Sequence, residues 1–170
     1  PFAGRANAAY RAADALVAVS QTYLDRAHEA NPNAPGEVVY IGADFDTLER
    51  VQAKTFSDGL THFFYLGTLS FSYDMETVCK GVQKLLNAGE KVALHIMGGG
   101  PDLEKLKAYA NESILFYGYV PYAEMMAVAK GCDIAVNPIQ SHSAASITNK
   151  LSDYMALQKP ILNSQVNDEV

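Results

Sequence analysis

Basic runs, long apolar runs and paired cysteines are scarce in this sequence of 170 residues, and each absence excludes a class of protein. Asp and Glu outnumber Lys and Arg by 19 to 13, and the net charge of −6 argues against nucleic acid as the main partner. No apolar run approaches the roughly 20 residues of a membrane span. Cys79 and Cys132 lack metal-ligand spacing and lie in apolar contexts, which predicts buried free thiols in a reducing compartment.

Several nucleotide-binding and catalytic motifs are also missing. The run 98–101, GGGP, lacks the GK[ST] ending of a Walker loop, and the dinucleotide fingerprint GxGxxG is absent. We interpret this run as a turn that lines a cleft, with Pro101 at the first position of a helix. No convincing Ser-His-Asp order, metal cluster or Cys-His pair occurs. His62 and His95 lie in or at expected strands and His28 lies on an expected helix, and all three are interpreted as structural or exposed. His142, in the SHSAAS loop, is then the histidine of interest.

Short apolar segments do alternate with helical segments of about 10–15 residues from residue 62 onward, and this alternation predicts βαβ units. The expected fold class is α/β, a Rossmann-like doubly wound parallel sheet with helices on both faces. The expected strands are 62–67, 91–98, 114–118, 132–139 and 159–164, and the expected helices are 75–89, 101–110, 122–131 and 148–158. Before them we expect a helix at 5–15, buried strands at 16–20 and 37–42, and a helix after the capping residue Ser20.

Ligands of such a sheet bind beyond the carboxyl ends of its strands. Three of the four strand ends in the regular region carry a glycine, namely Gly67, Gly98 and Gly118. The fourth strand leads into a loop of small residues, SHSAAS, at 141–146. Glycine permits sharp turns and close approach of the backbone, so together these ends mark one edge of the sheet as a binding edge.

The segment after that loop contains several polar and charged residues that could bind a ligand. Thr148 or Asn149 can cap the expected helix, near whose start Lys150 and Asp153 lie. Free backbone N–H groups, a lysine and a carboxylate at a helix start can bind a phosphate and a sugar. The alternative is a solvated lysine and an acidic first turn that complements the helix dipole.

The buried face of that helix is expected to contain Leu151, Tyr154 and Met155, which are spaced i, i+3 and i+4. Lys150 and Asp153 are then expected to project away from the core.

Taken in order, these segments resemble the donor-binding half of GT-B glycosyltransferases, specifically the retaining group called glycosyltransferase family 4. The resemblance covers nearly the whole chain and rests on ADALVAVSQTYLD, VVYIGADFD, FFYLGTLSFSYDMETV, LHIMGGGPDLEKL, ILFYGYVPYAEMMAVAKGCDIAVNP and NKLSDYMALQKPIL. It implies retaining transfer of a sugar from a nucleotide-diphosphate sugar to a glycan or lipid-linked acceptor, as in polysaccharide biosynthesis. It also implies no metal or other cofactor, no nucleic-acid partner, and a location in the cytoplasm or at the inner face of the membrane.

The resemblance further implies a domain organisation. Residues 1–54 would cross over from the acceptor domain, and residues 55–170 would form a C-terminally truncated donor domain. The missing N-terminal half would contact the acceptor and any membrane surface, so the fragment alone is expected to be inactive.

Individual roles follow from the resemblance. The turn at Gly67 and Thr68 would face the diphosphate and sugar, with Gly98 on the same edge, and the backbone at Tyr119 and Val120 would hydrogen-bond the base. Asp153 would replace the second glutamate of the family's paired-glutamate motif and bind ribose hydroxyls. The residues expected to present N–H groups to the diphosphate are Ser146, Ile147, Thr148, Asn149 and Lys150.

Departures from the family pattern keep other functions open. Ala145 stands where the first glutamate of the pair is expected, and Thr68 and Tyr73 hold the positions of the usual arginine and lysine. Lys150 could replace part of that charge. The alternatives are a non-catalytic module that binds nucleotide sugars and a GT-B sugar-nucleotide epimerase, for which His142 is the one acid or base candidate.

Overall fold

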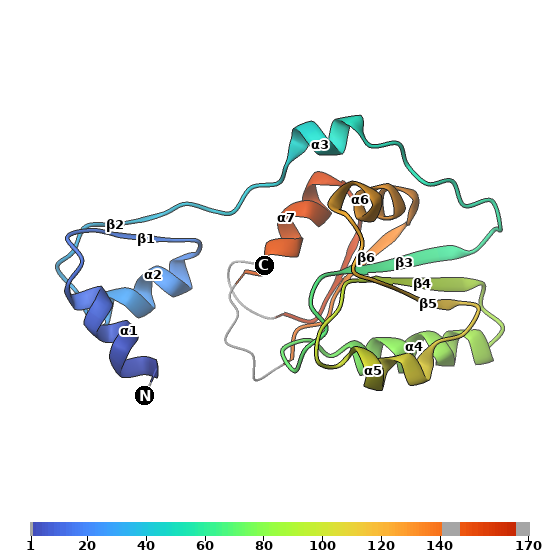
Figure 1. The fold of residues 1–170 in the computed structure, drawn as a ribbon, viewed down its shortest axis with the longest axis horizontal. Coiled ribbons are helices and arrows are strands. Elements are labelled where there is room, and N and C mark those ends of the chain that lie inside the picture. Colours follow the sequence, from blue (N-terminus) through green and yellow to red (C-terminus); the bar gives the residue numbers. More distant parts are fainter. Residues whose placement is uncertain (1, 141–146, 166–170) are drawn as a thin grey trace. The chain divides into compact units, whose positions relative to one another are not determined.

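The computed structural model describes residues 2–140 and 147–165, and the chain divides into two compact units (Figure 1). The smaller unit comes mainly from the chain up to Gly42, and the larger one begins at Ala43. No helix of the described residues is long and apolar enough to cross a membrane. The assignment of residues 1–54 and 55–170 to two parts of a longer enzyme stays a prediction.

The smaller unit contains two helices and a two-stranded parallel sheet, α1 (Phe2–Arg11), β1 (Leu16–Ala18), α2 (Gln21–His28) and β2 (Gly36–Val38). Ser20 caps α2 as predicted, because its side chain accepts a hydrogen bond from the Tyr23 backbone N–H. The buried strand predicted at 37–42 is wrong. The strand β2 ends at Val38, and the Val39 N–H makes one further hydrogen bond to β1, to the Ala18 carbonyl at 2.8 Å. Val39 and Tyr40 are exposed.

The larger unit is built on a five-stranded sheet that is parallel throughout, as predicted. The strand order is β5-β4-β3-β6-β7. Every residue of β4 is buried, which is typical of a parallel strand covered by helices on both faces. The strands are β3 (Thr61–Leu66), β4 (Val92–Met97), β5 (Ile114–Gly118), β6 (Ile134–Asn137) and β7 (Ile161–Asn163).

Helices cover both faces of this sheet. The lower face in Figure 1 carries α4 (Met75–Asn87) and α5 (Leu103–Leu106), and the upper face carries α6 (Tyr122–Gly131) and α7 (Asn149–Ala156). A shorter helix, α3 (Phe45–Arg50), contacts α6. The doubly wound α/β class is therefore confirmed.

The helix predicted at 101–110 is shorter than expected and continues only as a 3₁₀ turn, η1 (Lys107–Tyr109). Pro101 precedes the first helical residue and does not occupy it. The cause is the preceding turn, in which the backbone N–H of Asp102 donates to the Leu69 carbonyl oxygen. A Cβ at Gly100 would lie only 2.2 Å from that oxygen, so the chain is held against the turn after β3 before the helix begins.

Both cysteines are buried free thiols, as predicted. Burial raises the pKa of Cys79 to about 11 and the pKa of Cys132 to about 12, so neither forms a thiolate near neutral pH.

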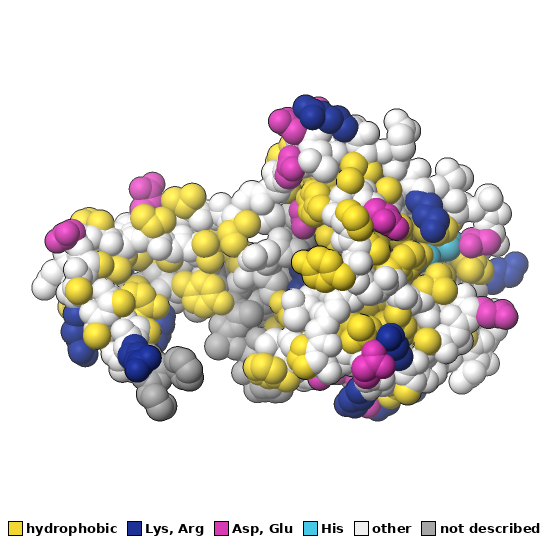
Figure 2. Space-filling view, viewed as in Figure 1, with side chains coloured by type: hydrophobic (Ala, Val, Ile, Leu, Met, Phe, Trp, Pro, Cys, Tyr) yellow, Lys and Arg dark blue, Asp and Glu magenta, His cyan; other side chains and the backbone are white. Residues whose placement is uncertain are grey.

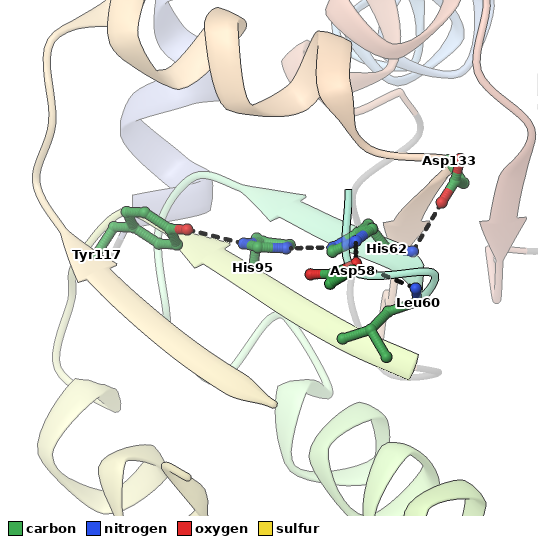
Figure 3. A network of polar contacts seen from close by, with 6 residues as sticks. All are labelled: Asp58, Leu60, His62, His95, Tyr117 and Asp133. Carbon is green, nitrogen blue, oxygen red and sulfur yellow. Dashed lines mark hydrogen bonds and ion pairs between the residues drawn. The ribbon is translucent and has the colours of Figure 1, made fainter. Parts of the chain in front are cut away.

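His62 and His95 are structural, and they form a buried polar chain across β3, β4 and β5 (Figure 3). His62 Nε2 lies 3.0 Å from a carboxylate oxygen of Asp58, and its Nδ1 lies 2.9 Å from His95 Nε2. The Tyr117 hydroxyl completes the chain, 2.8 Å from His95 Nδ1. Two neutral rings satisfy all three contacts, with Tyr117 donating to His95, His95 to His62, and His62 to Asp58.

Candidate functional site

The strand order places a topological switch point between β3 and β6. From β3 the chain adds β4 and β5 on one side, and it then crosses over to add β6 and β7 on the other. At such a point the loops after two adjacent strands run in opposite directions and leave a crevice for a ligand. The turn at Gly67 follows β3, and the segment that leads to α7 follows β6.

The structure brings the three predicted glycines together at this edge. The Gly67 N–H donates to the Met97 carbonyl at 2.9 Å, and the Gly98 N–H donates to the Gly118 carbonyl at 2.8 Å. Gly98 has φ +133°, and a Cβ added to it would lie 1.9 Å from the Gly67 carbonyl oxygen. Only glycine fits at position 98, so the ends of β3, β4 and β5 contact one another directly through main-chain atoms.

Lys150 lies inside the larger unit and not in solvent, which overturns both the solvated lysine and the expected orientation of α7. Its residue surface is 8% exposed, whereas Met155, expected in the core, is 64% exposed. The buried face of α7 is centred on Leu151 and Tyr154, and Lys150 lies on the flank of that face opposite to the one where Met155 was expected.

The Lys150 side chain reaches the turn after β3. Its Cε lies 3.3 Å from the position that a Cβ on Gly67 would occupy, and its Nζ lies 3.6 Å from the ring centroid of Tyr73. Burial lowers the pKa of the ammonium to about 7. None of the ion pairs between described residues involves Lys150. A buried cation without a counter-anion among these residues, beside a glycine turn, is suited to an anionic ligand.

Asp153 lies one turn further along α7 and is half-buried. Burial raises the pKa of its carboxyl group, while a hydrogen bond from the Tyr122 hydroxyl to Oδ1, 2.7 Å long, opposes that rise. Tyr122 is the first residue of α6 and follows Tyr119 and Val120 closely in the chain. The contact therefore joins the proposed ribose-binding carboxylate to the helix that begins just after the proposed base-binding segment.

The other predicted site residues in the described part of the chain differ in their exposure. Thr68 is exposed, and its carbonyl accepts a hydrogen bond from the Tyr65 hydroxyl at 2.6 Å. Tyr119 is 96% exposed and available to a ligand. Ile147 is half-buried, Thr148 is buried, and Asn149 is the first residue of α7. Ser146, together with Ala145 and His142, lies outside the described residues.

Sequence reasoning gave no role to Tyr65 or Tyr122. It noted Tyr73 as the residue at the position of the usual lysine and otherwise interpreted its surroundings as the approach to a helix. That helix begins as predicted, with Asp74 Oδ1 accepting from the Thr77 N–H. Position could have identified the tyrosines, because Tyr65 and Tyr73 flank the glycine turn and Tyr122 opens the helix after Tyr119.

The described side chains include no group of three or more His, Cys, Asp or Glu residues that could hold a metal ion. On the face drawn in Figure 2, Lys and Arg side chains are scattered among Asp and Glu, and they do not gather into one basic patch.

Comparison with known proteins identifies the family. Residues 61–170 match the family model described as glycosyl transferases group 1. An uncharacterized glycosyltransferase of Methanocaldococcus jannaschii is 25% identical over 169 residues, covering 91% of this chain and 42% of the relative. The chain therefore spans less than half the length of this curated relative.

Solved structures of glycosyltransferases share the fold. The lipopolysaccharide outer core galactosyltransferase WaaB, in its apo form, has a TM-score of 0.62 and 23% identity over 88% of this chain and 42% of its own. Anabaena HepE, in complex with UDP, has a TM-score of 0.68 and 16% sequence identity, over 92% of this chain and 46% of its own. The pneumococcal O-GlcNAc transferase GtfA, in complex with UDP and GlcNAc, has a TM-score of 0.69 and 12% sequence identity, over 96% of this chain and 32% of its own. The chain has the fold of one part of a GT-B glycosyltransferase, and it belongs to the glycosyl transferases group 1 family.

Proposed function

We propose that this chain is the donor-binding part of a glycosyltransferase that uses a nucleotide-diphosphate sugar and transfers the sugar with retention to a glycan or lipid-linked acceptor. The observation that carries the proposal is Lys150, a buried cation beside the Gly67 turn at the switch point of the sheet. Two structures of the same fold were solved with UDP, which supports a nucleotide diphosphate as the ligand.

The chemistry requires stabilisation of the leaving diphosphate. Negative charge develops on that group as the glycosidic bond breaks, and prepositioned N–H donors and cations lower the energy of the transition state. In this chain Lys150 and the N–H groups at the start of α7 would supply that stabilisation. Asp153, fixed by Tyr122, would accept hydrogen bonds from the ribose hydroxyls. We propose that no metal is required.

Calorimetric titration of the full-length protein tests this function, with UDP, GDP and ADP and their nucleosides, each with and without EDTA. We expect Lys150→Met to weaken binding of the preferred diphosphate at least about tenfold and to leave nucleoside binding unchanged, because one charge-assisted contact is lost. Lys91→Met is the matched control, since Lys91 is exposed and precedes β4 at the opposite edge of the sheet. Failure of all three diphosphates to bind the natural protein would refute the function.

A non-catalytic module that binds nucleotide sugars is the second candidate, and Ala145 is the observation that favours it. The family resemblance places a glutamate there, near the transferred sugar, and alanine has no group for acid-base or charge-stabilising work. The two candidates differ in turnover. A transferase releases UDP from its donor sugar when an acceptor is present, whereas the module binds the donor and leaves it intact.

A further inference from the structure

The Lys150 ammonium is held by two tyrosine rings. Its Nζ lies 3.6 Å from the centroid of Tyr73 and 5.2 Å from that of Tyr65. The rings themselves meet edge to face, with centroids 5.9 Å apart. The face of an aromatic ring is electron-rich and attracts an ammonium, most strongly where water is excluded. The rings therefore stabilise the position of the cation without neutralising its charge.

Both rings are fixed by the two strand ends that flank the switch point. Tyr65 lies on β3, is fully buried, and donates its hydroxyl hydrogen to the Thr68 carbonyl, which shapes the turn after Gly67. The Tyr73 backbone forms a β-bridge with Ile139, beyond the end of β6. The next residue, Asp74, donates its N–H to the Pro138 carbonyl at 2.8 Å. The backbone of Tyr73, in the loop after β3, is thus anchored to the segment that follows β6.

We propose that Tyr73 is a positioning residue for the diphosphate site, and that its ring holds the Lys150 ammonium against the Gly67 turn, where the donor's phosphates bind. This inference rests on the proposed function and goes beyond it, because it assigns a role to a residue that does not touch the substrate. It also accounts for a departure from the family pattern. The loop after β3 supplies a ring at position 73, and the cation comes from α7.

A purely structural role does not explain why a lysine at position 150 is buried against the Tyr73 ring. An apolar side chain at position 150 would fill the same space without the cost of burying an amine. Among the described residues, the phenols of Tyr65 and Tyr73 are titratable groups that face the ammonium, and no carboxylate there forms an ion pair with it. Burial lowers the pKa of Lys150 to about 7, and a bound diphosphate would favour the protonated form. Binding of the diphosphate is therefore coupled to uptake of a proton.

The test is the UDP affinity of the full-length protein between about pH 7 and 9, a range in which the terminal phosphate stays ionised because its pKa is near 6. GDP or ADP replaces UDP if one of them is the preferred diphosphate. In the natural protein we expect affinity to fall as the pH rises through this range. Tyr73→Phe keeps the ring and should match the natural protein within about twofold in affinity, with the same pH profile.

Tyr73→Leu removes the ring, and we expect about fivefold weaker UDP binding, since a desolvated cation–π contact is lost. Its pH dependence should move to lower pH, because a ring that stabilises the charged form is removed and the pKa of the ammonium falls further. Uridine binding should stay unchanged. Tyr73→Met, which fills the space with a flexible apolar chain, should behave in the same way and serves if the leucine variant folds poorly.

Natural affinity and a natural pH profile in both ringless variants would overturn the role of Tyr73, while a loss of affinity in Lys150→Met would still support the proposed function. Equal loss of UDP and uridine binding in the ringless variants would also overturn it, because general damage to the site would then explain the result. Absence of diphosphate binding in the natural protein would reject the proposed function itself.

Discussion

At the scale of single residues, the burial of Lys150 lowers stability, although the proposed function requires it. A lysine with a pKa near 7 in the folded chain and 10.5 as its usual value is harder to charge when folded. The unfolded chain therefore binds more protons between pH 7 and 10.5, and folding is penalised most at and below the lower end of that range. Proteins accept such penalties at binding sites, where an unpaired group is kept for a ligand.

We predict that Lys150→Met stabilises the unliganded protein by about 1–3 kcal/mol at pH 7.5, because the cost of desolvating the amine is removed. Urea unfolding followed by circular dichroism measures the change. The advantage of the variant should shrink steadily as the pH rises from 7.5 toward 10.5, because the natural side chain is neutral in both states only above that range. Lys91→Met should change stability by less than about 0.5 kcal/mol, as expected for an exposed lysine. A destabilised Lys150→Met protein would contradict the argument.

The residue scale also shows where sequence reasoning succeeded. Gly67, Gly98 and Gly118 were predicted to mark one edge, because strand ends of a parallel sheet meet there regardless of side-chain detail. The predicted orientation of Lys150 was wrong. The spacing of apolar residues along a helix leaves the rotation of the buried face about the helix axis uncertain by about one residue. Aromatic contacts from β3 and the loop after it decide that rotation, and no local pattern in 148–158 contains them.

At the scale of elements, α6 and α7 act together, because one hydrogen bond between Tyr122 and Asp153 connects them. Their boundaries were predictable: α6 matches its predicted range, and α7 lies within its own. The contact between α6 and α7 was not predictable, because it joins residues 31 positions apart and depends on the handedness of the crossovers.

We predict that Asp153→Ala weakens nucleotide and nucleoside binding by about tenfold without unfolding the protein, since charge-assisted contacts to ribose are lost. Tyr122→Phe keeps the Asp153 carboxylate and removes the hydroxyl that orients it. The loss of binding affinity in this variant should therefore be smaller than in Asp153→Ala. Calorimetry with the nucleoside and its 2′,3′-dideoxy analogue checks the assignment. The natural protein should discriminate between the two ligands, and Asp153→Ala should not. Unchanged nucleoside affinity in Asp153→Ala would remove the ribose role.

At the scale of the whole molecule, the alternation of apolar and helical segments was enough to predict a parallel doubly wound sheet. The strand order was not predicted, because it depends on which edge each crossover joins. The strand predicted at 37–42 failed for a related reason. A short β-rich run forms a regular strand only where a neighbouring strand continues beside it, and the register of β1 with β2 ends at the pair Ala18 and Val38.

Global stability should depend on pH through the histidine chain. Burial, with smaller contributions from His62 and Lys54, lowers the pKa of His95 to about 4 from 6.5. The unfolded chain then binds the extra proton between pH 6.5 and 4, so stability that is complete above pH 6.5 is lost as the pH falls through this window.

We predict a loss of up to about 3 kcal/mol from His95 over that window. Chemical unfolding at a series of pH values measures it. His95→Gln should be less stable at pH 7.5, because the contacts to His62 and Tyr117 are disturbed, and should lose less on acidification. His28→Gln, in the smaller unit, is the control and should leave the acid dependence unchanged. Parallel curves for His95→Gln and the natural protein would refute the assignment.

The backbone floor formed by Gly67, Gly98 and Gly118 has a consequence for how such a protein evolves. Substitution changes side chains, and a surface made of main-chain atoms offers mutation almost nothing to alter without loss of the fold. In the proposed donor site, new preferences would therefore have to arise from side chains, such as those proposed at Thr68, Tyr119, Lys150 and Asp153. A lineage could exchange the cation at one wall for a cation at another and inherit the floor unchanged.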